Sequence, residues 1–178
     1  FPVELNEVPL EEFYRAINYA APGLIRTAAD ELTYPFHIMI RYEMEKMIFE
    51  QDVDVMELPK LWNQKYEEYL GITPENDTVG ILQDIHWAGG KFGYFPSYAL
   101  GSAIAAQLYH YIETVMPVKT YLEEGNLKPI QEFLKERIHK YGASKTTQEL
   151  LKETTGEEFN PEYYIAYLTK KYSELYQI

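Results

Sequence analysis

The segment PFHIMIRYEMEKMIFE, residues 35–50, sets the expected fold class of the chain. Its apolar residues recur at the period of a helix with one buried face, and they are Phe36, Met39, Ile40, Met44, Met47 and Ile48. The opposite face is expected to present Arg41, Glu45 and Lys46. The helical pattern reaches back to about Leu24, but Pro35 interrupts it. We therefore expect a kink or a break near Tyr34.

The same period recurs on both sides of this segment. Upstream, a short helix is expected after Pro9, and the Ala21-Pro22-Gly23 step should end it. Downstream, helices are expected at about residues 58–70, 95–115, 118–124, 129–141, 146–153 and from 161 onward. Residues 76–94 show no sustained period and are rich in glycine, which is typical of a functional loop. Because the sequence shows no strand alternation, internal repeat or linker, we expect one all-helical unit over residues 1–178.

Composition narrows the functional class. The chain has 178 residues, 46% of them apolar, which is enough for one domain with a core. Its net charge of −12 argues against binding to nucleic acid or to an anionic membrane surface. Charges interrupt every apolar stretch before it reaches the ~20 residues that span a bilayer. Cysteine is absent, so disulfides and thiolate sites are excluded, and no secretory pattern opens the chain. A cytoplasmic protein is expected.

A candidate site lies where the glycine-rich segment meets the expected 95–115 helix. His86, Tyr94 and Tyr98 fall within thirteen residues there. The N-terminus of a helix has unpaired N–H groups and partial positive charge, so it favours an anion. Donors that converge at such a place would fit a carboxylate ligand or a developing oxyanion.

The neighbours of His86 could support it. Asp84 or Gln83 could orient the imidazole ring by a hydrogen bond, and Trp87 adjoins it in the sequence. Each residue alone also has an ordinary explanation. A histidine beside a tryptophan can be a hydrogen-bonded core residue, and a tyrosine in a first helical turn can be simple packing.

A second segment, IRTAADELTY at residues 25–34, places Arg26 and Asp30 four positions apart. On one helix face this spacing gives an ion pair worth a few tenths of a kcal/mol, so function is not required to explain it.

The chain offers no metal site of its own in the sequence. Its four histidines are His37, His86, His110 and His139. No two stand four positions apart, and His-Glu-x-x-His is absent. His110 and Glu113 have a spacing found in di-metal bundles, but a second such pair is missing. We therefore expect no metal ligand in this chain.

Taken together, the Gly-x-x-Gln-Asp-x-His-Trp motif at 80–87 and the Ile-Arg-x-x-Ala-Asp motif at 25–30 resemble two motifs of the Taq carboxypeptidases, a family of thermostable metallocarboxypeptidases. The similarity extends to the stretches at 29–34, 69–74, 92–96 and 160–163 and covers essentially the whole chain. The resemblance implies an all-α fold cut by a deep groove. It also implies a cytoplasmic homodimer that releases single residues from peptide C-termini with broad specificity.

The resemblance further implies Zn²⁺ or Co²⁺, held by a His-Glu-x-x-His helix and a later Glu. Neither this motif nor the family's His-Pro-Phe and Asp-x-Arg-x-Thr motifs occurs here, and all three come earlier in the family's chain order. We therefore expect that an N-terminal portion is missing and that this chain, as a C-terminal part, is inactive by itself. A natural inactive paralogue is the other explanation.

For individual residues, the resemblance implies that His86 and Tyr98 or Tyr94 donate to the tetrahedral intermediate or to the peptide's C-terminal carboxylate. Related metallopeptidases place a His and one or two Tyr downstream of the metal helices, although the spacing differs somewhat. Asp30 is expected to order the groove wall, and Arg26 is a weaker candidate because the family accepts Ala there.

Gln83 and Asp84 are expected to hold the His86 ring. The alternative function is a non-catalytic helical module whose tyrosine-rich groove binds a peptide or a partner protein.

Overall fold

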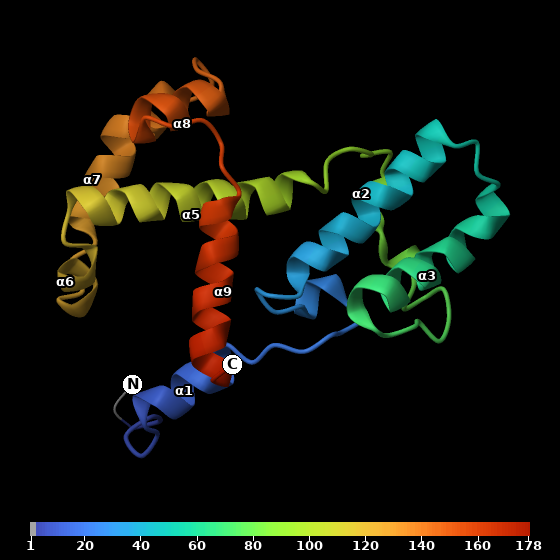
Figure 1. Cartoon of the computed structure of the whole chain (residues 1–178), viewed down its shortest axis with the longest axis horizontal. Helices are drawn as coiled ribbons and strands as arrows, with labels where there is room; N and C mark the ends of the chain where they lie inside the picture. The colour runs from blue at the N-terminus through green and yellow to red at the C-terminus, as the bar shows by residue number, and fades with distance from the viewer. Residues whose placement is uncertain (1–2) are drawn as a thin grey trace. The chain divides into compact units, whose positions relative to one another are not determined.

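The computed structural model describes residues 3–178, and these residues form helices and connecting loops without a strand (Figure 1). The chain divides into two compact units, unit 1 at Phe1–Ala99 and unit 2 at Leu100–Ile178. That residues 1–178 belong to a single domain stays a prediction. No helix within residues 3–178 is both long enough and apolar enough to cross a bilayer.

Unit 1 is built on two long helices joined by a short connection. Its elements are α1 (Leu10–Ile17), η1 (Arg26–Ala28), α2 (Tyr34–Glu50), η2 (Val55–Glu57), α3 (Leu58–Leu70), η3 (Ile81–Gln83) and α4 (Ile85–Ala88). The predicted break near Tyr34 is confirmed, because α2 begins at that residue with Pro35 in its first turn. Asp30 shapes the chain just before it: Oδ1 accepts the N–H groups of Leu32 and Thr33 at 2.9 and 2.8 Å.

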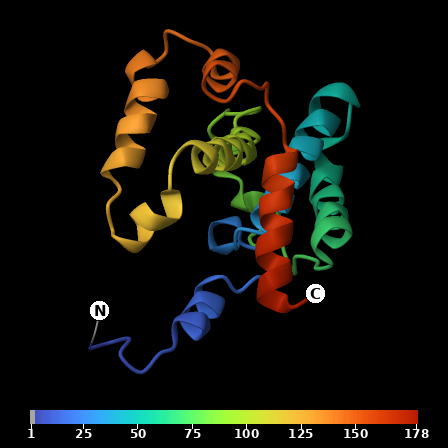
Figure 2. The same cartoon turned by 60° about the vertical axis from the view of Figure 1, so that its left-hand side comes forward.

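The core of unit 1 lies between α2 and α3, which run side by side (Figures 1 and 2). Its buried residues are Ile40, Met44, Trp62, Tyr66 and Leu70. Trp62 and Tyr66, one turn apart on α3, stack with their ring centroids 5.1 Å apart. α3 ends as predicted at Gly71, whose φ of +67° is the left-handed conformation of a helix C-cap.

Two charged residues of α2 contradict the predicted amphipathic pattern. Arg41 is 0% exposed and Glu45 is 7% exposed, so the prediction that both face away from the core is wrong. The reason is that residues 84–95 pack against this side of α2, which is therefore buried on two sides. Met39, predicted on the apolar face, is 43% exposed.

Unit 2 contains the rest of α5 (Ser97–Val115) followed by α6 (Val118–Glu123), α7 (Lys128–Arg137), η4 (His139–Tyr141), α8 (Thr147–Thr155) and α9 (Glu162–Tyr176). α8 begins with the predicted capping box, in which Thr146 and Glu149 each bond to the other's backbone N–H. Gln107 on α5 is buried and fixes the α8–α9 connection. Its amide donates to the Glu158 carbonyl at 2.9 Å, and its side-chain oxygen accepts the Asn160 N–H at 3.0 Å.

Candidate functional site

His86, Tyr94 and Tyr98 lie together where α5 begins, and we call them the ring cluster. The His86 ring stacks on Tyr94 with centroids 5.6 Å apart and lies edge-on to Tyr98 at 6.0 Å. Tyr94 and Tyr98 are 5.6 Å apart. The imidazole is largely buried, whereas Tyr94 and Tyr98 are 51% and 38% exposed. The cluster therefore has one packed side and one side that solvent or a ligand can reach.

Phe95 is the buried residue against which His86 and Tyr98 of the ring cluster pack. It is 0% exposed, and its ring lies 5.2 Å from both His86 and Tyr98, centroid to centroid. Gly93, with φ of +75°, turns the chain immediately before Tyr94. α5 starts at Ser97, two residues later than predicted, so Tyr98 is in its first turn and Tyr94 precedes the helix.

Desolvation and the neighbouring Tyr94 raise the pKa of the Tyr98 hydroxyl. The phenol therefore keeps its proton at neutral pH and can donate a hydrogen bond.

Asp84 holds the backbone of His86 rather than its ring. Its Oδ1 accepts the N–H groups of His86 and Trp87 at 2.8 and 2.9 Å and so caps α4. The same oxygen is 3.9 Å from the His86 Nδ1 atom, which is buried without a hydrogen-bond partner. The prediction that Asp84 orients the ring by a hydrogen bond is therefore wrong, because its oxygens are engaged elsewhere.

Gln83 is also engaged elsewhere. Its side-chain amide donates to the carbonyl of Leu24 at 3.1 Å and to that of Val79. It ties the loop before α4 to the chain ahead of η1, and it does not reach His86. Its expected role of holding the imidazole is therefore corrected.

Arg41 is the centre of the packing beneath the site. Its Nε donates to Asp84 Oδ2 at 2.7 Å, with both side chains fully buried, and its Nη1 donates to the His37 carbonyl at 2.8 Å. The guanidinium carbon lies 4.8 Å from the Trp62 ring centroid and 4.7 Å from that of Phe95. Cation–π contact and the ion pair thus compensate its desolvation.

Arg26 lies over Phe95 as well, with its guanidinium carbon 4.8 Å from the ring centroid. The predicted helix-face pair with Asp30 is absent. Arg26 is in the 3₁₀ turn η1, and Asp30 lies beyond its end. Asp30 bonds instead to Ala21, Leu32 and Thr33. Arg26 forms no salt bridge with a carboxylate within residues 3–178. Its guanidinium N–H groups could therefore bind an anionic group of a ligand.

The family model for Carboxypeptidase Taq (M32) metallopeptidase matches residues 1–172. The chain belongs to this family. It is 54% identical to Carboxypeptidase 1 of Bacillus subtilis over 98% of its own length and 35% of that protein. It is 40% identical to Thermostable carboxypeptidase 1 of Thermus thermophilus, over 97% of the chain and 34% of that protein. The crystal structure of an M32 carboxypeptidase from Deinococcus radiodurans R1 superimposes with a TM-score of 0.95 at 36% identity, covering 100% of this chain and 36% of the other. The chain thus spans about a third of the length of the relatives it matches.

In this member of the Taq carboxypeptidase family, the ring cluster brings together the three residues predicted to be catalytic. Trp87 packs in the core of unit 1, with its ring stacked on Phe92 at 6.0 Å and edge-on to Trp62 at 5.8 Å, centroid to centroid. Sequence reasoning missed Arg41 and Glu45. Their side chains bond to residues between 84 and 93 and so attach that loop to α2. No sequence signal distinguishes these two residues from the other charged residues of α2, which are Glu43, Lys46 and Glu50.

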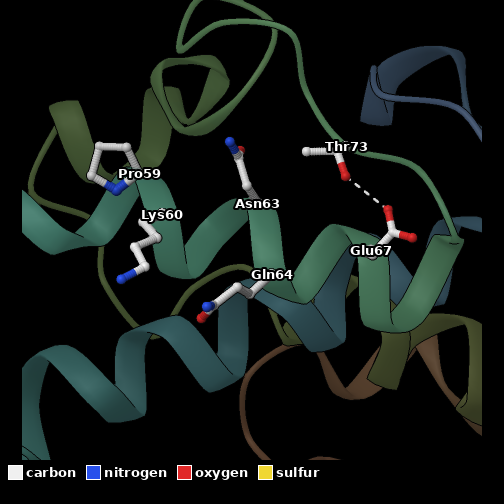
Figure 3. A pocket seen from close by; sticks show the side chains of 6 residues that line it. All are labelled: Pro59, Lys60, Asn63, Gln64, Glu67 and Thr73. Atoms are coloured by element: carbon white, nitrogen blue, oxygen red, sulfur yellow. Dashed lines mark hydrogen bonds between the residues drawn. The ribbon is translucent and has the colours of Figure 1, made fainter.

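The acidic and histidine side chains of residues 3–178 bear on whether a metal ion could be held here. Within residues 3–178 no group of three or more His, Cys, Asp or Glu side chains is arranged to hold a metal ion. A shallow cavity of about 490 Å³ lies on the outward face of α3 (Figure 3). Its lining is Pro59, Lys60, Asn63, Gln64, Glu67 and Thr73. It shares no residue with the ring cluster, and its hydroxyl and carboxylate are already joined in a 2.7 Å bond between Thr73 and Glu67.

Proposed function

We propose that this chain is the C-terminal part of a metal-dependent carboxypeptidase that releases single C-terminal amino acids from peptides with broad specificity. Family membership over residues 1–172 supports the reaction class. The ring cluster is the observation that supports a role of this chain in binding the substrate. The ring centroids of His86, Tyr94 and Tyr98 lie within 6.0 Å of one another at the start of α5. The substrates are peptides.

The chain's own contribution is to bind and orient the peptide. His86 and Tyr98, or Tyr94, donate hydrogen bonds to the oxygen that becomes negative as the carbonyl is attacked, or to the peptide's C-terminal carboxylate. Arg26 provides positive charge next to Phe95 for that carboxylate. The metal supplies Lewis-acid chemistry, and we propose Zn²⁺ or Co²⁺. Because residues 3–178 do not provide a ligand set, we assign no step through it to this chain.

The cellular context is proposed from the family alone. We propose that the active protein contains a further N-terminal portion with the metal ligands, forms a homodimer and is located in the cytoplasm. Size determination and cell fractionation of the longer protein test the last two points.

The role of the ring cluster can be tested in the longer protein. Tyr98→Phe and His86→Ala each remove one donor, and kcat/KM should fall roughly 10²–10³-fold, as is usual for loss of an oxyanion donor. Tyr94→Phe identifies which phenol contributes more. Tyr42→Phe, which changes an exposed tyrosine on α2, is the matched control and should leave kcat/KM unchanged.

Near-normal kcat/KM in both His86→Ala and Tyr98→Phe would contradict the proposal. Binding of peptides by the longer protein without hydrolysis, in the presence of Zn²⁺ or Co²⁺, would favour the non-catalytic peptide-binding module instead.

A further inference from the structure

Glu45 is a buried carboxylate that pairs with no cation in the described part of the chain. Its Oε1 accepts the indole N–H of Trp87 at 2.7 Å, and its Oε2 accepts the backbone N–H of Gly93 at 2.8 Å. Burial of an unpaired carboxylate is unfavourable, and two charge-assisted hydrogen bonds compensate it. Each oxygen therefore has one specific partner.

Arg41 lies one turn before Glu45 on the same helix and contacts the other end of the same loop. It holds Asp84, whose carboxylate also caps the backbone of His86 and Trp87. We call residues 84–93 the histidine loop. Two neighbouring charged side chains of α2 thus hold the histidine loop, Arg41 at its first residue and Glu45 at its last.

The first part of the histidine loop is the short helix α4, and the part after it is rich in glycine. Gly90 and Gly93 have φ of +69° and +75°. Glycine adopts many backbone conformations at similar energy, so the sequence after α4 does not by itself select one of them. Internal bonds such as Lys91 N–H to the His86 carbonyl, 2.8 Å, close the turn but do not anchor it to the core.

We propose that Glu45 is a positioning residue for the ring cluster. By fixing Gly93 relative to Trp87, it places the next residue, Tyr94, against the His86 ring and sets the position of Tyr98 in the first turn of α5. This inference rests on the proposed function of the ring cluster. It assigns a role in the reaction to a residue outside both sequence motifs.

Glutamine is a sharp probe of this role. A carboxylate offers two acceptor oxygens, whereas a carboxamide of the same shape offers one acceptor and one donor. With Gln at position 45, one of the two N–H groups, of Trp87 or of Gly93, would face another N–H group. Volume is kept, and one anchor of the loop is lost.

The test uses Glu45→Gln in the longer, metal-loaded protein, with Glu43→Gln as the matched control. Glu43 is on the same helix but bonds to Lys65 and Tyr69, away from the loop. We expect kcat to fall roughly 10- to 100-fold with KM changed little, because misplaced groups weaken the transition state more than substrate binding. Hydrogen exchange should quicken in peptides covering 88–95 and stay unchanged in α3. Glu43→Gln should change neither.

A second variant keeps the inference testable if Glu45→Gln folds poorly. Trp87→Phe removes the indole donor, keeps an aromatic ring and leaves the Gly93 bond, so its kcat should fall less. The double variant should lose less than the product of the two single losses, because both act through one carboxylate.

Normal kcat in Glu45→Gln, or faster exchange spread throughout α2 and α3, would overturn the inference. The proposed function fails separately. In that case His86→Ala and Tyr98→Phe would remain active, while Glu45→Gln would still quicken exchange in the histidine loop.

Discussion

His37 lies 0% exposed beneath the α2–α3 contact, with its Nδ1 3.0 Å from the hydroxyl of Tyr66. Burial, and then the nearby positive charge of Arg41, lowers the pKa of this histidine from 6.5 to about 4. The folded chain therefore keeps the imidazole neutral at pH values where the unfolded chain protonates it. Between these two pKa values the unfolded state binds more protons, so the free energy of unfolding falls as the pH is lowered.

This predicts a specific loss of stability in acid. From about pH 6.5 down to about pH 4, His37 should remove about 3 kcal/mol from the free energy of unfolding. In His37→Asn, which leaves a polar group near Tyr66, the variant should lose correspondingly less over the same window. Urea unfolding followed by circular dichroism at several pH values measures this, with the exposed His139→Asn as control. Parallel pH curves for His37→Asn and the parent would refute it.

At the residue scale, the sequence predicted which side chains meet but not what holds them. His86, Tyr94 and Tyr98 are close along the chain, and the start of a helix brings such neighbours together. Arg41 and Glu45 are about forty residues earlier, and their burial depends on a loop returning to α2. Periodicity within α2 contains no information about that return.

At the scale of elements, predictions succeeded where a local signal marks an end. Pro35 marks the start of α2, Gly71 the end of α3, and the Thr146 capping box the start of α8. They were less accurate where no such signal exists. The helix expected at 129–141 ends at Arg137, and a separate 3₁₀ turn follows. The apolar period alone does not distinguish a continuous helix from a helix followed by a tighter turn.

Two glycines should respond in opposite directions to the same substitution. Gly71 has φ of +67°, and a Cβ there would meet nothing within 4 Å, so Gly71→Ala costs only backbone energy, about 1 kcal/mol. Gly101 lies inside α5, also with open space around it, so Gly101→Ala should stabilise that helix by about 1 kcal/mol. Hydrogen exchange of amides in α3 and α5 measures both. An unchanged α3 in Gly71→Ala would argue against the left-handed cap.

At the scale of the whole molecule, family membership and length lead to one expectation. The chain matches the family over residues 1–172 but spans about a third of its relatives. Incubated alone with a blocked peptide and Zn²⁺ or Co²⁺, it should release no C-terminal amino acid, because residues 3–178 present no metal-ligand group. The longer protein should release it. Release by the chain alone that a chelator abolishes would show that a metal centre had been overlooked.

The all-helical class follows from the sequence, because periodicity reports on each helix separately. The division into two compact units does not follow from it. The long helix α5 runs across the boundary at Ala99 without interruption, and neither Pro96 nor Gly101 breaks it there. The amino-acid composition therefore does not indicate where unit 1 ends and unit 2 begins.

The two units differ in whether their unfolding can be followed by tryptophan fluorescence. Both indoles, Trp62 and Trp87, belong to unit 1, where their rings make an edge-to-face contact with centroids 5.8 Å apart. Unit 2 has tyrosines but no tryptophan. Fluorescence excited at a wavelength that only indole absorbs thus reports on the α2–α3 core and does not detect changes in α6–α9. If unit 2 melts first, the emission will remain native while the helical signal has already begun to disappear.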